Sequence, residues 1–249
     1  MRMMTRRAVW VLLAVAVVLT AWLAFFRPSS APYVRTPPSS DAYASRAASG
    51  DPETRTSAIA ELVRRKDDVA VSALVRILET DQAPGFRAAA GHGLGKIGDK
   101  KALPALTKAL DDKSELVFRS AFSAMGRLDD PRVVDVLKPH LMQTKDPVRA
   151  DEAAWALRNF PTRRVEDLLL RRLRQTGVST ASINVVLSLG SVGSKRALGA
   201  LRDLRRTLPQ DLTPAADDMP AAARVGFDLA SAVDLALKQI EERVEGGKR

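Results

Sequence analysis

Four segments of this chain repeat one another at an almost constant spacing, and this repeat constrains the fold more than any other feature. The segments are GLGKIGDKKALPALTKAL from Gly93, AMGRLDDPRVVDVLKPHL from Ala124, ALRNFPTRRVEDLLLRRL from Ala156 and SLGSVGSKRALGALRDLR from Ser188. Successive copies are offset by 31, 32 and 32 residues. A unit of this length buries its apolar side only by stacking on its neighbours. The chain is therefore expected to fold as an array of similar units.

Three apolar columns and one basic column step together through the four copies. They are Leu94, Met125, Leu157 and Leu189; Ile97, Leu128, Phe160 and Val192; Leu106, Leu137, Leu169 and Leu201; and Lys101, Arg132, Arg164 and Arg196. Agreement in all four columns excludes a coincidental alignment.

The first copy begins with a glycine pattern that also occurs in nucleotide-binding loops. In GLGKIG the spacing is Gly-x-Gly-x-x-Gly. The places of Gly95 and Gly98 are taken in later copies by Gly126, Arg158 and Gly190, and by Asp129, Pro161 and Gly193. A phosphate cradle requires its glycines for close backbone approach, whereas a turn between helices accepts these residues. We interpret the hexapeptide as an inter-helix corner.

Each unit divides into two helical patterns around that corner. In one unit, SELVFRSAFSAMGRL and DPRVVDVLKPHLMQ both carry apolar residues at helical spacing. Pro131 suits the first turn of the second helix, and Pro139 is expected to bend it. A degenerate unit starts at Asp51, which gives five helix pairs over residues 51–208. With 46% hydrophobic but only 5% aromatic residues, the composition also favours an all-α fold.

These features resemble the HEAT repeat superfamily, in its short bacterial form related to the lyase-type HEAT-like repeats. The resemblance rests on an acidic or Asp-Pro start, a Val-Arg pair and a small-residue helix, as in KDPVRADEAAWAL, with Leu-Gly at the corner. It implies a right-handed α-α superhelix over residues 51–208. It also implies a structural role for the matching arginines Arg55, Arg87, Arg119 and Arg149, which the fifth unit, GVSTASINVVLSLG, lacks.

The N-terminal region has a different character, because residues 8–26 contain no charged side chain. As a helix these residues would span about 28 Å, close to the roughly 30 Å hydrocarbon core of a bilayer. Residues 1–27 are therefore expected to form a cytoplasmic stub and a single transmembrane anchor. Arg2, Arg6 and Arg7 would keep the N-terminus in the cytoplasm, with the repeats on the periplasmic or extracellular side. A cleaved signal peptide is the alternative, although bulky residues occupy its expected cleavage region.

Two further segments flank the repeats. Residues 28–50 are rich in proline and serine and are expected to form a linker. Residues 209–249 begin with the polar stretch PQDLTPAADDMP, and AAARVGFDLASAVDLALKQIEERV follows it. This second stretch has one apolar stripe and is expected to form a C-terminal capping helix, with Asp217 or Asp218 as its cap and Pro220 in its first turn.

Most of the positive charge outside the N-terminus lies in the last two helix pairs. Residues 158–206 contain 11 basic and 3 acidic residues. Since second helices of HEAT-like arrays usually line the concave face, we expect a basic strip there, which could bind an acidic partner or could serve only as a solvated surface. The candidate partner-binding residues are Arg164, Arg171, Arg174, Arg196, Arg202 and Arg206.

Function is therefore sought in binding rather than in catalysis. The sequence has no cysteine, and its two histidines, His92 and His140, are far apart, so no catalytic residue, cofactor or metal site is assigned. The first hypothesis is a membrane-anchored scaffold that binds a partner protein with an acidic surface. The second is binding to an anionic polymer or a membrane surface. The third is an enzyme, because HEAT-like repeats occur in bilin lyases and alkyl-base DNA glycosylases. Nucleic acid is disfavoured because no aromatic residues interleave the strip.

Overall fold

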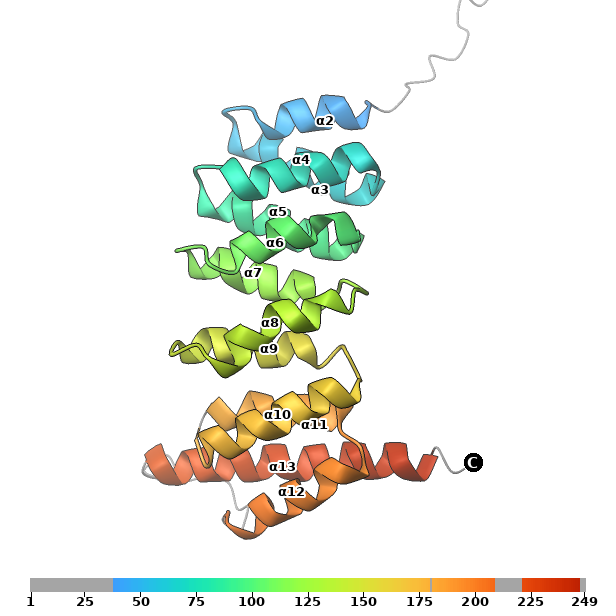
Figure 1. Ribbon diagram of the computed structural model, residues 1–249. Helices are drawn as coiled ribbons and strands as arrows, with labels where there is room; N and C mark the ends of the chain where they lie inside the picture. Colours follow the sequence, from blue (N-terminus) through green and yellow to red (C-terminus); the bar gives the residue numbers. More distant parts are fainter. Residues whose placement is uncertain (1–37, 180, 209–220, 247–249) are drawn as a thin grey trace, which may run out of the picture. The chain divides into compact units, whose positions relative to one another are not determined.

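The computed structural model describes residues 38–179, 181–208 and 221–246, and all regular structure in these ranges is helical (Figure 1). The helices are α2 (Ser40–Ala47), α3 (Pro52–Arg65), α4 (Asp68–Thr80), α5 (Pro84–Ile97), η1 (Lys100–Ala102), α6 (Leu103–Ala109), α7 (Glu115–Met125), α8 (Arg132–Met142), α9 (Pro147–Leu157), α10 (Arg163–Thr176), α11 (Ala181–Val192), α12 (Lys195–Arg206) and α13 (Ala221–Gly246). The expected all-α fold with five helix pairs, α3/α4 to α11/α12, is confirmed.

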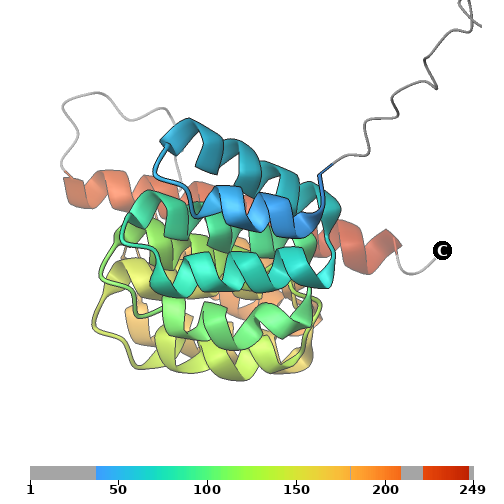
Figure 2. The ribbon, with the colours of Figure 1, turned by 90° about the horizontal axis from the view of Figure 1, so that it is seen from above.

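The helix pairs stack in chain order and form two layers (Figures 1 and 2). The first helices of the pairs, α3, α5, α7, α9 and α11, contact one another in sequence. In the second layer, α4 contacts α6 and α8 contacts α10, which in turn contacts α12. Each second helix also packs on the first helix of the next pair. The units are thus held together by contacts between pairs, as expected for a repeat array. The right-handed twist of the array stays a prediction.

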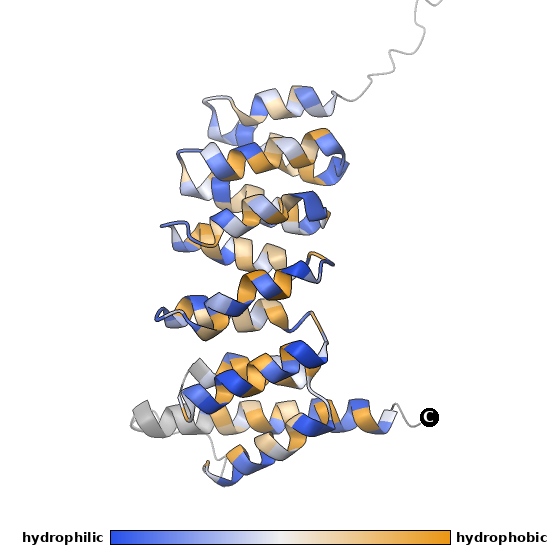
Figure 3. Ribbon diagram, in the orientation of Figure 1, coloured by the Kyte–Doolittle hydropathy of each residue, from blue (hydrophilic) through white to orange (hydrophobic). Residues whose placement is uncertain are grey.

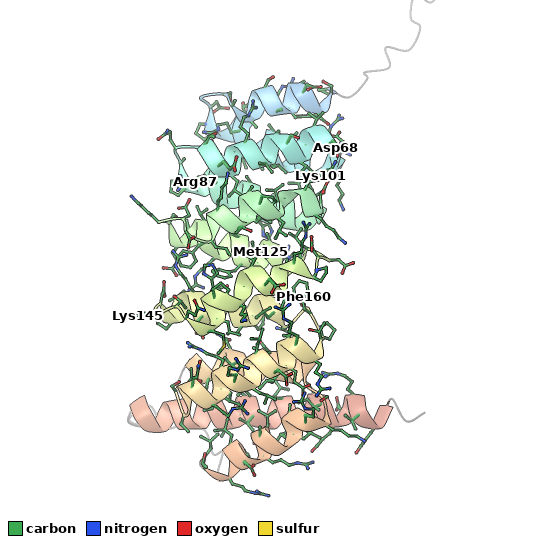
Figure 4. All side chains as sticks on the ribbon, in the orientation of Figure 1. Asp68, Arg87, Lys101, Met125, Lys145 and Phe160 are labelled. Atoms are coloured by element: carbon green, nitrogen blue, oxygen red, sulfur yellow. The ribbon has the colours of Figure 1, made fainter. Side chains whose placement is uncertain are left out.

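The apolar columns of the repeat form the core between the layers. Leu94, Met125, Leu157 and Leu189 are each 0% exposed, and so are the four leucines from Leu106 to Leu201. In Figure 3 the apolar residues follow the inner sides of the helices, and Figure 4 shows Met125 within the stack. Burial of one equivalent leucine per helix therefore fixes the register of every unit.

The glycines of GLGKIG act mainly within a helix, which corrects the expectation of a corner. Gly93 and Gly95 lie in the last turns of α5, and only Gly98 is at the corner, in the left-handed conformation with φ 77°. A Cβ on Gly95 would lie 2.6 Å from the Cα of Ala124 in α7. Gly95 therefore allows α5 and α7 to pack with their backbones in contact. The pattern closes a helix C-terminus, so it has no helix N-terminus to offer a phosphate.

Three of the four matching arginines have the structural role that the resemblance implies. Arg87 forms two hydrogen bonds to Asp112, at 2.9 and 3.0 Å, and its position near one end of the second pair is marked in Figure 4. Arg55 pairs with Asp81, and Arg149 donates to the backbone oxygen of Asp112 at 3.0 Å. These side chains are only 16–18% exposed.

Arg119 differs from the other three arginines. It is 47% exposed and bonds Glu115 and Glu152 instead. Phe118 occupies the neighbouring position on α7, and the guanidinium of Arg149 lies 4.1 Å from its ring centroid. An aromatic ring thus replaces the buried cation in this pair, and the adjacent Arg119 is left at the surface.

The N-terminal boundary of the folded part also differs from the expectation. The linker proposed for residues 28–50 is wrong at its end, because Ser40–Ala47 forms α2, with Ser39 as its N-cap. This helix contacts α3 and α4, and Ala47 is completely buried against the core. The serines that suggested a linker instead cap and begin a short helix.

The C-terminal helix α13 covers the end of the array as expected. Leu229, Val233, Ala236 and Ile240 are each 0% exposed, and α13 contacts both α11 and α12. Arg243 donates to the backbone oxygen of Gly193 at 2.7 Å and to that of Gly190, so it caps the C-terminus of α11. The proposed capping residues at 217, 218 and 220 lie outside the described residues.

Within the described ranges, no helix combines the length and the apolar content needed to cross a membrane. The predicted anchor, residues 8–26, lies outside those ranges.

Candidate functional site

The predicted basic strip lies on α10 and α12, and both helices have a strongly apolar side that fixes which residues face outward. In α10, Val165 and Leu169 are 0% exposed, and in α12 so are Ala197 and Leu201. Glu166, only 3% exposed, accepts hydrogen bonds from the backbone N–H and the hydroxyl of Ser194. This contact joins the first turn of α12 to α10. The six predicted arginines therefore belong to two helices whose rotation is fixed by the core.

Four of these six arginines form ion pairs with acidic residues of this same chain. Arg164 pairs with Asp135 of α8, Arg196 with Asp167 of α10 at 2.8 Å, Arg202 with Glu241 of α13 at 2.7 Å, and Arg206 with Asp203 at 2.8 Å. Their side chains remain between 49% and 77% exposed, so they face solvent as predicted. Their charges are nevertheless largely compensated within the protein.

Arg171 and Arg174 are exposed and form no ion pair with another described residue. Arg171 lines a hollow of about 430 Å³ between α8 and α10, together with Lys138, Arg163, Arg164, Asp167 and Leu168. We call this feature the basic hollow. Four basic side chains and one acidic side chain line it, and both Arg164 and Asp167 are engaged in ion pairs. The uncompensated charge of the strip therefore comes from Lys138, Arg163 and Arg171.

Hydrogen bonding perturbs the charged groups at the edge of this hollow. A hydrogen bond from Arg164 holds the pKa of Asp135 below its ordinary value, and the nearby charges of Arg164 and Lys138 lower it further. The same bond raises the pKa of Arg164. Both groups therefore keep their charges throughout the neutral range, and Asp135 stays bound to Arg164 rather than to Lys138.

The second layer is electrically uneven along its length. Between α4 and α6, Lys101 bonds Asp68 at 2.7 Å and Lys108 bonds Glu79 at 2.8 Å, so that each base has an acid (Figure 4). The hollow beside Lys101 is lined by Val71, Ser72 and Val75 as well as this pair. Between α8 and α10, by contrast, three bases remain without an acid. Any acidic ligand of this layer would therefore be attracted to its α8–α10 part.

The ionisable residues outside this surface do not form a catalytic constellation in the described ranges. Burial lowers the pKa of both His92 and His140, and the His140 ring lies 5.5 Å from that of Phe122. Burial raises the pKa of Asp151 and of Glu152, which lie next to each other on α9. No group of three or more metal-ligating side chains occurs among the described residues. These groups are packed within the helical layers.

Two residues of the basic hollow were not among the predicted ones. Arg163 precedes Arg164 in the first turn of α10, and Lys138 comes from α8, a helix outside the strip. A sequence signal existed for the pairing. Asp135 and Arg164 are 29 residues apart, and so are Asp167 and Arg196. Because the unit length is 31 or 32 residues, this spacing places a base beside an acid of the preceding pair.

Comparison with known sequences agrees with this architecture. Residues 77–158 match the family HEAT repeats. This part of the chain, which covers α5 to α9, belongs to the HEAT repeat superfamily. No curated protein matches the chain.

Similar solved structures have low sequence identity. An engineered protein is 20% identical, with a TM-score of 0.46, and the match covers 82% of this chain and 97% of that chain. The complex of CpcE and CpcF of phycocyanin lyase from Nostoc sp. is 19% identical, with a TM-score of 0.41 and coverages of 83% and 100%. Human deoxyhypusine hydroxylase in complex with glycerol is 16% identical, with a TM-score of 0.36 and coverages of 82% and 84%. At these TM-scores we base no argument on the three structures.

Proposed function

We propose that this protein is a membrane-anchored HEAT-repeat scaffold that binds an acidic partner protein through its second-helix layer, outside the cytoplasmic membrane. A stack of HEAT-like helix pairs is a fold suited to protein binding. The observation that carries the proposal is the basic hollow. Lys138, Arg163 and Arg171 converge there from two helices, and none of them has an acidic partner among the described residues.

The ion pairs determine which part of the predicted strip would act. Arg164 and Arg196 already bond carboxylates of the preceding helix, so a partner would have to compete with Asp135 and Asp167 for them. Lys138, Arg163 and Arg171 carry no such cost. Because these three line one hollow, their fields add within a Debye length of about 8 Å at physiological salt. A field of this kind speeds the capture of an acidic surface more than it raises the final affinity.

The anchor is the second part of the proposal. Residues 8–26 have the length and composition of a transmembrane helix, and the arginines before them favour a cytoplasmic N-terminus. The repeat array would then be exposed outside the cytoplasmic membrane. Since α2 starts at Ser40, the linker between anchor and array would be shorter than residues 28–50.

Binding of an anionic polymer or membrane surface is the second candidate function, and the same unpaired bases favour it. Elution from a polyanion column separates the two. A polymer binder would elute with a steep dependence on salt, because each phosphate-like contact adds to the slope. An enzyme of the lyase or glycosylase type has less support, because no described residues form a site with a nucleophile, a base and a positioning group.

Crosslinking in cells, followed by mass spectrometry, tests the scaffold function. The variant Arg163→Glu/Arg171→Glu reverses two unpaired charges of the basic hollow without breaking an ion pair. We expect it to lose at least about 90% of the crosslinks to the partner, with an unchanged thermal midpoint, since exposed substitutions have small effects on stability.

The matched control is Lys96→Glu/Lys113→Glu, which changes the net charge equally at two exposed lysines away from the hollow. This control should retain the crosslinked partners. Equal yields from wild type and the Arg163→Glu/Arg171→Glu variant would exclude the basic hollow as the binding surface.

A further inference from the structure

A second basic surface lies on the first-helix layer, at the C-terminal ends of α7 and α9. Trp155 is 43% exposed, and it is the only aromatic residue among the large exposed hydrophobic side chains of the described ranges. A hollow of about 190 Å³ opens beside it, lined also by Ser123, Arg127, Arg158 and Asn159. Neither the repeat pattern nor the basic strip on α10 and α12 includes these residues. We call this feature the Trp155 hollow.

The arginines of this hollow are unpaired and one of them is pre-oriented. The guanidinium of Arg158 lies 4.0 Å from the ring centroid of Trp155. Stacking uses the flat face of the guanidinium and leaves the N–H groups on its edge free to bind a carboxylate. Neither Arg158 nor Arg127 forms an ion pair with another described residue. Bases at a helix C-terminus complement the helix dipole, but this does not explain why a tryptophan is exposed beside them.

Positive charge continues along this edge toward α5. Arg127 follows α7 directly, and Lys96 is in the last turn of α5, 31 residues earlier. Both are close enough to His92 for their charges to lower its pKa, after the larger effect of burial of its ring. Lys96, Arg127 and Arg158 thus follow one another over three successive first helices. Packed helices are about 8–10 Å apart, so the three charges are spaced at about that interval.

We propose that this edge binds an extended acidic segment of a partner protein, with one Asp or Glu carboxylate held between Arg127 and Arg158 in the Trp155 hollow. The hollow has the size of a single side chain, and the side chains of Ser123 and Asn159 provide further polar groups for the ligand. An extended chain advances about 10 Å in three residues, which matches the spacing of the bases. A nucleic-acid base is disfavoured, because Arg158 already covers one face of the indole.

Tryptophan fluorescence of the full-length chain tests this proposal. The protein has three tryptophans, so changing Trp10 and Trp22 to Phe leaves Trp155 as the sole reporter. The probe is a short acetylated peptide with Glu at every third position and Gly or Ser elsewhere. Titration with it should change the Trp155 emission, whereas the same peptide with Gln for Glu should bind at least about tenfold more weakly.

Three variants locate the site. Arg158→Gln should weaken binding of the Glu peptide about tenfold, because a charge-assisted bond to a pre-oriented group is lost. Arg127→Gln, which leaves the stack on Trp155 intact, should weaken it by a smaller factor. The charge-matched control Lys113→Gln should bind like wild type. Arg171→Glu should also bind like wild type, which separates this edge from the basic hollow.

Circular dichroism of each variant confirms that it has the wild-type helix content. Equal affinities of Arg158→Gln and Lys113→Gln for the Glu peptide would overturn the proposal, as would equal binding of the Gln and Glu peptides. Tighter binding of a single-stranded oligonucleotide, itself weakened by Arg158→Gln, would also overturn it and assign the edge to nucleic acid instead.

Discussion

Replacing Gly95 with alanine would force α5 and α7 apart at the point where their backbones meet. The new Cβ would lie 2.6 Å from the Cα and 2.8 Å from the Cβ of Ala124. Ordinary carbon contacts are about 3.5–4.0 Å, so the helices would have to separate locally by roughly an ångström. The obstacle includes the backbone of α7, so a change of side-chain rotamer cannot remove it.

Two opposing effects set the size of the change in stability. Alanine is a better helix former than glycine by about 1 kcal/mol, and Gly95 lies inside α5. Overpacking a core typically costs about 1–3 kcal/mol, and a clash with backbone belongs at the upper end of that range. We therefore expect a net loss of about 1–2 kcal/mol in the free energy of unfolding. The glycine is kept for close packing rather than for a special backbone angle.

Gly199 provides the matched control. It lies within α12, is exposed, and an added Cβ there would have no atom within 4 Å. Gly199→Ala should therefore stabilise the protein by about 0.5–1 kcal/mol through helix propensity alone. Urea denaturation followed by circular dichroism measures both variants. If Gly95→Ala raised the denaturation midpoint as Gly199→Ala does, α5 and α7 would not meet at Gly95 and the packing argument would fail.

Further predictions concern ion pairs, acid stability and topology. Arg87→Met should lower the free energy of unfolding by about 2 kcal/mol in a urea titration, because it leaves the shielded Asp112 without its partner. Arg164→Met should leave the urea midpoint almost unchanged, since its pair is exposed. Hydrogen bonds from the Arg132 side chain and backbone lower the pKa of Asp130 from 3.8 to about 2. The stability that this carboxylate contributes is thus complete above pH 3.8 and is lost as the pH falls through about 2. The stability difference between wild type and Asp130→Asn should shrink over that interval in urea titrations at stepped pH, and a difference independent of pH would contradict this. A phosphatase fused to the C-terminus should be active only outside the cytoplasmic membrane and should fractionate with membranes, whereas a soluble product lacking the first 30 or so residues would indicate a cleaved signal peptide instead.

Much of the fold could be predicted from the sequence because the same burial requirement recurs in every unit. Leucines such as Leu94 and Leu157 are completely buried at equivalent places, and their 31- or 32-residue spacing gave the helix pairs before any coordinates. The segment Ser40–Ala47 was missed, because its serines resemble those of a linker and only contact with α3 and α4 shows that it is part of the array.

The candidate sites were predicted less completely. A helical wheel shows that Arg164 and Arg171 both face outward, but it contains no information about the neighbouring helix. Only the packing of α8 beside α10 shows that Arg164 is paired with Asp135, whereas Arg171 lies with Lys138 in the basic hollow. In the same way, Trp155 is an ordinary helix residue in the sequence and becomes part of a hollow only where α9 meets α7.

The sequence by itself thus determined that the chain is a stack of helix pairs, where each pair begins, and which residues are buried. These properties depend on apolar periodicity within one unit, and periodicity is written directly in the order of residues. The tertiary structure alone decided that Gly95 is a contact between helices and that some arginines are compensated while others are free. Those properties depend on distances between side chains about 30 residues apart, and such distances are set only when the units pack.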